Sequence, residues 1–544
     1  MLWLTDDQGW SNIGYHNSNC HTPNMDTLSR EGIRLDRHYS ANWCAPSRAS
    51  LMTGRLPQHV LERTTKQHVH AMKAWHGNAE TLVDGGDLTN RSLYVVPPQM
   101  TMLPRMLRDA GYKTHFVGKW GLGQTWPWQL PNARGFDSSF GYLGQSEDYC
   151  TQNADSQMGS GWSCGGVDLW LDDEPALGSN TTCSSMMYGV RIQKLIRQHD
   201  TSRPIFLFVA LQNMHSPAPP AESLRESFQR YYIDAAYTEE FFKANALASE
   251  ADLLLGSAVT ALKARGMWDS TLLVHASDNG GSYEYLHAPN SVVGNNHPLR
   301  GSKFTAFEGG VRVPAFVTGG LVPADRRGKT LTAVTHLADW LPTLLSVADV
   351  KADANEHGMP PVDGIDLWPY LLGQSNRTRT TLMLGVDNAF GATALINGSI
   401  KLLRSSPTQK GEPNCVQHAW TGPIFPNATT VATAAQLIEG DCPVPQDMLF
   451  DIYKDPGETW NLAADPRHQE LLVAMQTLML QLNESVAFSH DFYAQMPMSA
   501  EDDAIACEKA VEATSGFHAL YCKEPAEIMQ TRRVANRVVE RRRL

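Results

Sequence analysis

Residues 247–279 read LASEADLLLGSAVTALKARGMWDSTLLVHASDN. The first part, Leu247 to Arg265, has the pattern of a helix, and the glycine that follows is a typical helix stop. Leu272 to Ala276 is a short continuous apolar run, as expected of a strand buried on both faces. Asp278 and Asn279 come almost directly after it. A helix that leads into a buried strand in this way indicates an α/β fold.

The same alternation of helical and strand-like stretches runs through about the first 350 residues. Thr101 to Ala110 reads as a short helix that Gly111 ends. Further strand-like stretches are Tyr112 to Val117, Ile205 to Leu211 and Val311 to Val317. Strands that alternate with helices along a chain form an α/β sheet with helices on both faces, so we expect one large sheet.

Polar side chains follow the ends of four predicted strands. They are Asp6, Asp7, Lys119, His215, Asp278 and Asn279. Open α/β sheets bind ligands at the carboxyl ends of their strands, so these residues are expected to converge on one site. The alternative is that strand ends simply meet solvent and become polar.

Residues 44–55 read CAPSRASLMTGR and have the pattern of a helix with a reactive group at its start. Pro46 suits the first turn, where a missing N–H has no helical partner, and Gly54 suits the helix stop. A group at Cys44 would feel the positive end of the helix and the Arg48 guanidinium, and both favour an anion. The alternative is an unreactive buried thiol.

The spacing Cys-x-Pro-Ser-Arg-x-x-x-x-Thr-Gly-Arg in this segment resembles the signature of type I sulfatases. The resemblance covers roughly residues 1–490. It extends to Asp6 to Trp10, His21 to Asp26, Gly118 to Trp120, His215 to Pro217, Asp278 to Gly281, Leu299 to Lys303, Glu308 to Arg312, Asp339 to Leu344 and Asp455 to Glu458. The stretches Ser146 to Tyr149 and Leu299 to Arg312 are most similar to the arylsulfatase B-like subgroup, the N-acetylgalactosamine-4-sulfatases.

The resemblance implies an alkaline-phosphatase-like sandwich, in which helices flank a large central mixed β-sheet. A smaller C-terminal domain with a short antiparallel sheet should follow, since short strand-like pieces occur at Leu382 to Val386, Thr393 to Ile396 and Ile400 to Leu403. A helix is expected from about His468 to Leu482. We therefore expect a catalytic domain at 1–380, a smaller domain at 381–495 and an extension at 496–544 whose basic end is either a tail or a contact for a polyanion.

The resemblance also implies the chemistry of each site residue. Cys44 would be oxidised to formylglycine by a formylglycine-generating enzyme, and the hydrate of that aldehyde would attack sulfur. Arg48 would hold the reacting oxygen, and Lys119 and Lys303 would bind sulfate oxygens. Either His215 or Lys303 would protonate the leaving alcohol.

A metal site is implied by the same comparison. The family's ligands correspond here to Asp6, Asp7, Asp278 and Asn279, with the modified Cys44 beside them. These side chains offer oxygen ligands, which suit a hard divalent cation, and we expect one calcium ion. A solvated turn is the alternative reading of the paired aspartates.

One position departs from the family pattern. The second signature, Gly-Lys-Trp-His-Leu-Gly, is here Gly118-Lys119-Trp120-Gly121-Leu122-Gly123. Glycine carries no group that transfers a proton, so water or another histidine such as His115 would have to substitute. Two rival functions therefore stay open: a secreted pseudoenzyme that binds sulfated glycans, and a phosphoesterase of the same superfold, which would normally carry Ser or Thr at position 44.

Composition limits the partners. The chain of 544 residues carries a net charge of -12, which argues against a non-specific nucleic-acid binder. The longest apolar run has about seven residues, whereas a membrane span needs about 20. We expect a sulfated carbohydrate or an aryl sulfate as substrate. His68, His70 and His76 fit a solvated loop better than a second metal site.

Cysteine and sequon usage indicates the secretory pathway, with a secreted or lysosomal protein. No signal peptide is visible, and the chain opens inside an apolar strand, so it looks N-terminally truncated. Sequons start at Asn90, Asn180, Asn376, Asn397, Asn427 and Asn483. Nine cysteines leave at least one unpaired, which we expect to be Cys44. Short loop closure favours the pairs Cys150–Cys164, Cys415–Cys442 and Cys507–Cys522, with buried free thiols as the alternative.

Overall fold

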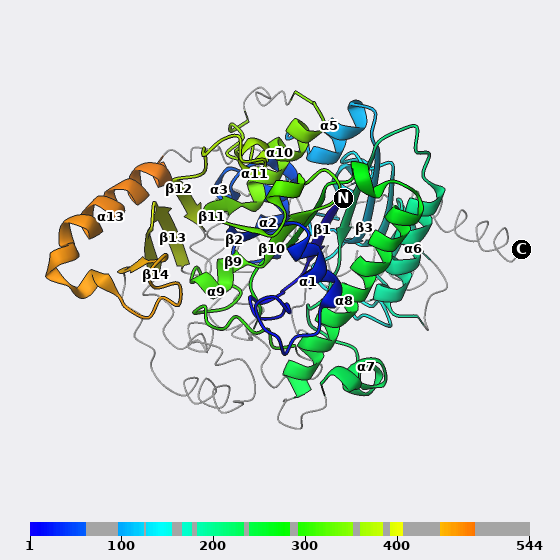
Figure 1. The fold of residues 1–544 in the computed structure, drawn as a ribbon, viewed down its shortest axis with the longest axis horizontal. Coiled ribbons are helices and arrows are strands. Elements are labelled where there is room, and N and C mark those ends of the chain that lie inside the picture. Colours follow the sequence, from blue (N-terminus) through cyan, green and yellow to red (C-terminus); the bar gives the residue numbers. More distant parts are fainter. Residues whose placement is uncertain are drawn as a thin grey trace, which may run out of the picture.

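The computed structural model describes residues 1–60, 96–124, 127–154, 166–176, 182–232, 239–282, 292–351, 359–384, 392–405 and 447–484. These residues form a large mixed sheet with helices on both faces and a smaller antiparallel sheet at one side (Figure 1). The expected fold class is confirmed.

The large sheet has the strand order β11-β2-β10-β8-β1-β7-β3-β4-β5-β6, and β9 pairs with β2. Its four central strands, β8, β1, β7 and β3, are mutually parallel, so their carboxyl ends lie at one edge. The strands are β1 Leu2–Thr5, β2 Ile33–Tyr39, β3 Lys113–Lys119, β4 Ser138–Tyr142, β5 Trp170–Leu171, β6 Glu174–Pro175, β7 Ile205–Ala210, β8 Leu273–Ser277, β9 Arg312–Val313, β10 Ala315–Thr318 and β11 Lys329–His336.

Helices cover both faces of this sheet because its central strands are apolar on both sides. In β1, Trp3 packs into one cluster with residues of α1, α6 and α8, while Leu2 and Leu4 pack into another with residues of α2, α5 and α10. Figure 1 shows α1, α6 and α8 in front of the sheet. The helices are α1 Pro23–Arg30, α2 Cys44–Thr53, α3 Pro57–Val60, α5 Leu103–Asp109, α6 Ser184–Gln198, α7 Ala221–Phe228, α8 Glu239–Ala264, α9 Glu308–Val311, α10 Trp340–Val347 and α11 Trp368–Leu371.

The small sheet consists of β12 Thr381–Leu384, β13 Ala392–Asn397, β14 Ile400–Ser405 and β15 Asp447–Asp451, all antiparallel. One face packs against α13 Gln469–Glu484 through residues such as Leu402 and Met479. The other face packs toward the large sheet, where Phe450 lies in one apolar cluster with Phe307 and with Tyr39 of β2. The small sheet and α13 lie together at the left of Figure 1.

Two expectations about local structure are wrong. The predicted strand at 311–317 is divided, because α9 ends at Val311 and β9 and β10 lie on either side of Pro314. Proline has no N–H to give to a strand ladder, which explains the break. Cys150 pairs with Cys183, 33 residues away, and not with Cys164, which lies outside the described residues.

The other predictions about cysteines and helices have mixed outcomes. Cys44 is free as expected, and Cys20 is free as well; the pairs proposed for positions 415, 442, 507 and 522 lie outside the described residues. No described helix is long and apolar enough to cross a membrane. The helix predicted from Leu247 begins at Glu239, eight residues earlier. The histidines at 68, 70 and 76, and the basic end, also fall outside the described residues.

Candidate active site

The central parallel strands bring the expected polar residues to one place. Asp6 and Asp7 follow β1, which lies between β8 and β7. Asp278 and Asn279 follow β8, Lys119 is the last residue of β3, and His215 lies in the segment after β7. The prediction that these strand ends converge is therefore confirmed by the sheet order and by the contacts below.

Helix α2 places Cys44 and Arg48 beside these strand ends. Cys44 is its first residue, and Gly54 ends it with a left-handed φ of 68°. The Cys44 Sγ donates to Asp6 Oδ1 at 3.2 Å. Arg48, one turn further on, donates from Nε and Nη2 to Asp278 Oδ2 at 3.0 and 2.8 Å, and from Nη1 to the Lys119 carbonyl at 2.7 Å.

Three cations pair with three carboxylates in the interior of the site. Lys119 Nζ lies 2.6 Å from Asp6 Oδ2, and Arg48 Nη2 lies 3.3 Å from the same oxygen. Lys303 Nζ lies 2.8 Å from Asp7 Oδ1. Buried charges of opposite sign stabilise one another only with such close geometry, so these side chains are held in fixed positions.

The carboxylates differ in pKa according to their neighbours. Burial alone would raise the pKa of Asp6, but Lys119, His215 and Arg48 outweigh it and hold the pKa well below its usual range. Burial raises the pKa of Asp7 to about 7, with Asp6 and Asp278 adding to the effect and Lys303 opposing it. Nearby positive charges therefore compensate the carboxylate of Asp7 less well than that of Asp6.

The thiol at position 44 is not the anion that its helix-start position suggests. Burial, and then Asp278 and Asp6, raise the pKa of the Cys44 thiol well above its usual value. Burial and the two carboxylates together outweigh Lys119 and Lys303, which lower the pKa. As an unmodified thiol, Cys44 is thus protonated and poorly nucleophilic.

The donor set fits a divalent cation. One potential ligand atom from each of Asp6, Asp7, Cys44 and His215 lies within 4.8 Å of the others. Asn279 donates from Nδ2 to Asp7 Oδ1 at 2.7 Å, and its own Oδ1 is buried without a hydrogen-bond partner among the described residues. An orphaned amide oxygen next to a buried carboxylate is an environment that a hard cation would satisfy.

Exposure differs slightly among the residues of the site. Lys119 and Asp278 are 0% exposed and Arg48 is 1% exposed, whereas Lys303 is 4% and His215 7% exposed. Lys303 and His215 are therefore slightly more exposed than Lys119 and Arg48. His215 Nδ1 contacts the Ser216 carbonyl, which fixes the proton there and leaves Nε2 as an acceptor 4.0 Å from Asp7 Oδ2.

Gly121 lies beside the nucleophile helix. Its φ is 67°, and a Cβ added there would lie 3.4 Å from Gln145 Oε1 and 3.5 Å from Arg48 Cδ. Gln145 Nε2 donates to the Gly121 carbonyl at 3.0 Å. Gln145 is a residue that the sequence reasoning missed, and the only signal for it was the glycine itself.

His115 is not placed to replace the missing side chain. It lies four residues before Lys119 in β3, which corresponds to about 13 Å along a strand. Its Nδ1 contacts Ser138 Oγ at 2.8 Å, on the neighbouring strand β4. This histidine belongs to the sheet's packing and not to the site.

The chain resembles known proteins over most of its length. A protein-family model described as Sulfatase matches residues 2–350. Arylsulfatase J of Mus musculus is 32% identical over 397 residues, which cover 73% of this chain and 59% of that protein. N-acetylgalactosamine-6-sulfatase of Homo sapiens is 27% identical over 505 residues, covering 89% of this chain and 85% of that protein. Thus the match spans about three fifths of arylsulfatase J.

A solved structure shows the same fold. The PsFucS1 sulfatase from Pseudoalteromonas sp. superposes with a TM-score of 0.63 at 22% identity, and the match covers 89% of each chain.

Proposed function

The chain belongs to the sulfatase family, and from that membership we propose that it hydrolyses a sulfate ester to an alcohol and inorganic sulfate. The observation that carries this proposal is the arrangement around Cys44. This residue starts α2, contacts Asp6, and is followed one turn later by Arg48, which contacts both Asp6 and Asp278.

We infer that Cys44 is converted to formylglycine by a formylglycine-generating enzyme. The protonated thiol is a poor nucleophile, which supports a modified side chain at this position. The aldehyde hydrate would supply the oxygen that attacks sulfur. Arg48 is placed to orient that oxygen, because the first turn of α2 and the two carboxylates fix its guanidinium.

A calcium ion is proposed at the strand ends, held by Asp6, Asp7, Asp278 and Asn279 with position 44 beside them. Support comes from the Asp6 and Asp7 carboxylate oxygens, which lie within 4.8 Å of each other and of the Cys44 sulfur, and from the orphaned Asn279 Oδ1. When bound, the ion would neutralise charge on the sulfate oxygens. The protein's own contribution is to keep three carboxyl groups and an amide together against their mutual repulsion, which the three buried cations make feasible.

The remaining cations would bind the sulfate group. Lys119 contacts Asp6 and Lys303 contacts Asp7, so the two ammonium groups would approach a bound sulfate from different carboxylates of the site. Burial lowers the pKa of His215, and Lys303 and Lys119 lower it further, so its ring is neutral and accepts at Nε2. Burial opposes the charge on Lys303, but Asp7 holds its pKa well above its usual value. We therefore assign the proton for the leaving alcohol to Lys303 and a positioning contact to His215.

The substrate we propose is a sulfated carbohydrate or an aryl sulfate, and the setting is the secretory pathway. Support comes from the relatives' names, from the Cys150–Cys183 disulfide and from two exposed sequon asparagines, Asn376 and Asn397. Disulfides persist in oxidising compartments, which favours secretion or a lysosome over the cytosol. The arylsulfatase B-like subgroup remains a prediction.

The deciding experiment joins peptide mass spectrometry at position 44 with a matched pair of cysteine variants. Cys44→Ala should reduce hydrolysis of an aryl sulfate by at least about 10³-fold, because it removes the nucleophile. Cys20→Ala removes the other free buried thiol of the described residues and should retain activity. Formylglycine at position 44 together with an inactive Cys44→Ala supports the proposal; parent-rate hydrolysis by that variant would refute it.

An inert protein would point to one of the rival functions. If the parent carries formylglycine, binds sulfated glycans and shows no turnover, the pseudoenzyme reading would stand, and Gly121 would be its structural basis. If phosphate esters are hydrolysed faster than sulfate esters, the phosphoesterase reading would stand. A side-by-side screen of both ester classes separates these outcomes.

A further inference from the structure

Glu458 connects the small sheet to the segment that carries Lys303. It lies just after β15 and is completely buried. Its side chain Oε2 accepts a hydrogen bond from the Glu308 backbone N–H at 2.6 Å. Its backbone carbonyl accepts one from Arg300 Nη1 at 3.4 Å. Both partners belong to another part of the chain, more than a hundred residues earlier.

Those two partners are the two ends of one loop. We call residues 300–308 the Lys303 loop. The Gly309 N–H closes it by donating to the Arg300 carbonyl at 2.6 Å. Glu458 thus contacts both the first and the last residue of the loop, so it holds the two ends of the loop in place.

Lys401 of β14 holds this contact in place. Its Nζ lies 2.9 Å from Glu308 Oε1 and 2.9 Å from Glu458 Oε1, and all three side chains are 0% exposed. Tyr39 adds a hydrogen bond to Glu308 Oε2 at 2.9 Å. Removing Lys401 would leave the two buried carboxylates without the cation that they share, so the cluster permits little movement.

The middle of the Lys303 loop reaches the proposed catalytic groups. Lys303 N–H donates to the Gly281 carbonyl at 3.1 Å, two residues after the proposed ligand Asn279. Phe304 N–H donates to the Asn42 carbonyl at 2.6 Å, two residues before Cys44. The ammonium of Lys303 contacts Asp7. Since residues 300–307 form no helix or strand, the direction of Lys303 depends on these ties.

We propose that Glu458 and Lys401 are positioning residues for Lys303, which makes the small sheet part of the reaction machinery. This inference rests on the role of Lys303 proposed above. The motif segments Asp455 to Glu458 and Glu308 to Arg312, which are far apart in the sequence, meet in this contact.

The test compares three variants with the parent on aryl sulfates. Glu458→Ala removes the acceptor for Glu308 N–H, and kcat on a substrate with a poor leaving group should fall by about 10- to 100-fold, because small misplacement of a reacting group has effects of this size. KM should change by less than about threefold, since Lys119 still binds sulfate. The variant Glu458→Gln keeps a side-chain acceptor for the Glu308 N–H and leaves Lys401 to pair with Glu308, so it should keep kcat within about threefold of the parent. It also covers the case in which Glu458→Ala does not fold.

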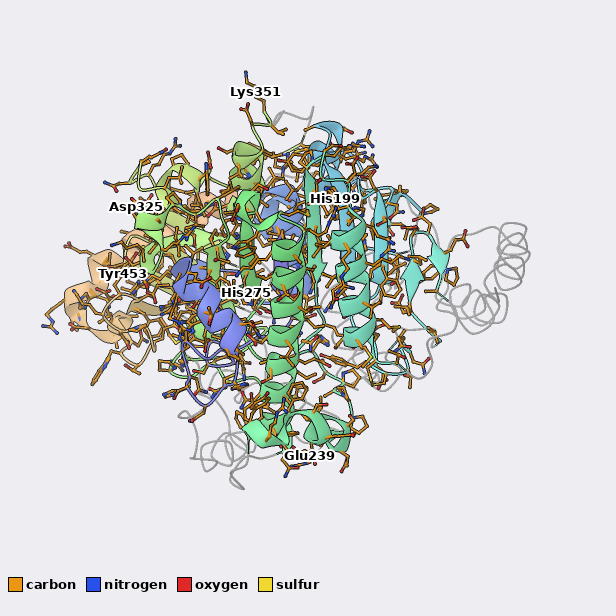
Figure 2. The ribbon with its side chains drawn as sticks, turned by 45° about the vertical axis from the view of Figure 1, so that its right-hand side comes forward. His199, Glu239, His275, Asp325, Lys351 and Tyr453 are labelled. Carbon is orange, nitrogen blue, oxygen red and sulfur yellow. A yellow bond between two sulfur atoms is a disulfide. The ribbon has the colours of Figure 1, made fainter. Side chains whose placement is uncertain are left out.

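Tyr453 provides the matched control. It lies on the same side of the molecule as the small sheet (Figure 2) and also joins the two sheets, through a hydrogen bond from its hydroxyl to the Thr332 carbonyl at 3.1 Å and through Arg37, whose guanidinium carbon lies 3.8 Å from its ring centroid. Neither partner belongs to the Lys303 loop. Tyr453→Ala should lower the melting temperature but leave kcat unchanged.

A double-mutant cycle distinguishes failure of the positioning proposal from failure of the role proposed for Lys303. In a Lys303→Met background, Glu458→Ala should cause no further loss of kcat, since it acts through Lys303. An equal loss in both backgrounds, or a loss no greater than that of Tyr453→Ala, would overturn the positioning proposal. If Lys303→Met itself leaves kcat unchanged, the failure lies in the proposed function instead.

Discussion

Lys303 and His215 are slightly more exposed than Lys119 and Arg48, and they differ in protonation. Lys303 carries a proton, and His215 is neutral with its proton directed to a backbone carbonyl. A proton donor matters most when the departing alcohol is a poor leaving group. Lys303→Met should therefore lose about 10²- to 10⁴-fold in kcat with alkyl or weakly acidic aryl sulfates and much less with an activated aryl sulfate.

A plot of log kcat against leaving-group pKa is the measurement. Its slope should become steeper for Lys303→Met and stay parallel to the parent for His215→Gln. A steeper slope for His215→Gln with an unchanged one for Lys303→Met would reverse the assignment.

Gly121 can be tested by adding the side chain that the family carries. A residue other than glycine at φ 67° costs about 1–2 kcal/mol, and the ring would also meet Gln145. We expect Gly121→His to raise kcat by roughly tenfold or less, below the range usual for a proton-transferring group. The gain should be larger in Gly121→His, Gln145→Ala, where the ring has space. The assay requires equal formylglycine content in all variants. Lower turnover in both variants despite a correctly placed ring would show that the missing side chain at position 121 does not limit kcat.

At the scale of single residues, sequence predicted the groups that a short motif carries and missed those that depend on distant contacts. Cys44 and Arg48 lie in one segment of fixed spacing. Gln145 and Glu458 act through neighbours that are distant in sequence, Gly121 and Glu308. Nothing in the local pattern of a glutamine or a glutamate indicates such a partner.

Strand β8 contains a histidine that packs without hydrogen bonds. His275 (Figure 2) stacks on Phe316 with ring centroids 4.7 Å apart, and neither ring nitrogen has a partner among the described residues. Burial lowers its pKa to about 3. In contrast, His38 in β2 has a similarly lowered pKa of about 3, but it contacts Thr335 Oγ1 and Trp340 Nε1.

We expect mutations of these two histidines to change the free energy of unfolding in opposite directions. His275→Phe should raise the free energy of unfolding by about 1–3 kcal/mol, because it removes an unsatisfied buried polar group. The gain should grow as the pH falls below about 6.5, since the unfolded chain then binds a proton that the folded protein excludes. His38→Phe should lower stability at neutral pH. Urea titrations at pH 7 and pH 5 measure both, and a destabilised His275→Phe would contradict the packing argument.

At the scale of elements, helices and strands were predictable where a single pattern spanned the whole element. The apolar run at 205–211 became β7, and the helix with Gly54 as its stop became α2. The run at 311–317 failed because Pro314 lies within an otherwise apolar sequence, and apolar composition alone does not show which backbone groups pair. Helix α8 starts eight residues before the predicted start, with the segment Glu239 to Ala246.

Calcium and pH should act on the whole molecule through Asp7. Its pKa of about 7 in the folded protein compares with about 4 for an unfolded aspartate. Between these values the unfolded chain has released a proton that the folded protein keeps, so with chelator present this residue lowers stability as the pH rises from about 4 to about 7. Calcium requires the ionised carboxylate, so its presence should oppose this fall: at 100 times its Kd the ion adds about 2.7 kcal/mol of stability relative to chelator at the same pH.

Asp7→Asn isolates this effect from other titrating groups. In chelator it should become progressively more stable than the parent as the pH rises, by up to about 1.4 kcal/mol per pH unit. In calcium it should be less stable than the parent because it lacks a charged ligand. Unfolding curves that remain parallel at every pH in both conditions would show that Asp7 binds no cation.

For the whole molecule, the α/β architecture followed from the alternation of elements, and the order of its strands did not. The order β8-β1-β7-β3 places Asp278 next to Asp6 although 272 residues separate them. The expected convergence of polar strand ends and the motif resemblance both predicted that proximity, but neither predicted the strand order. The division of the chain at residues 380 and 495 remains a prediction. The buried Glu308–Lys401–Glu458 cluster indicates that a cut at 380 would separate groups that need each other.

The long separation in sequence between α2 and β8 also sets the time that passes between their synthesis. Cys44 is 3% exposed once the protein has folded, and Arg48 pairs with Asp278, 230 residues further along the chain. A ribosome that adds about 5–20 residues per second needs roughly 10–50 s for that interval. Until β8 has been synthesised, the pocket around Cys44 has no wall on that side. An enzyme that modifies this cysteine therefore has a limited time in which Cys44 is accessible, and that time is set by the rate of translation. A rearranged gene that encoded β8 ahead of α2 would remove most of this time.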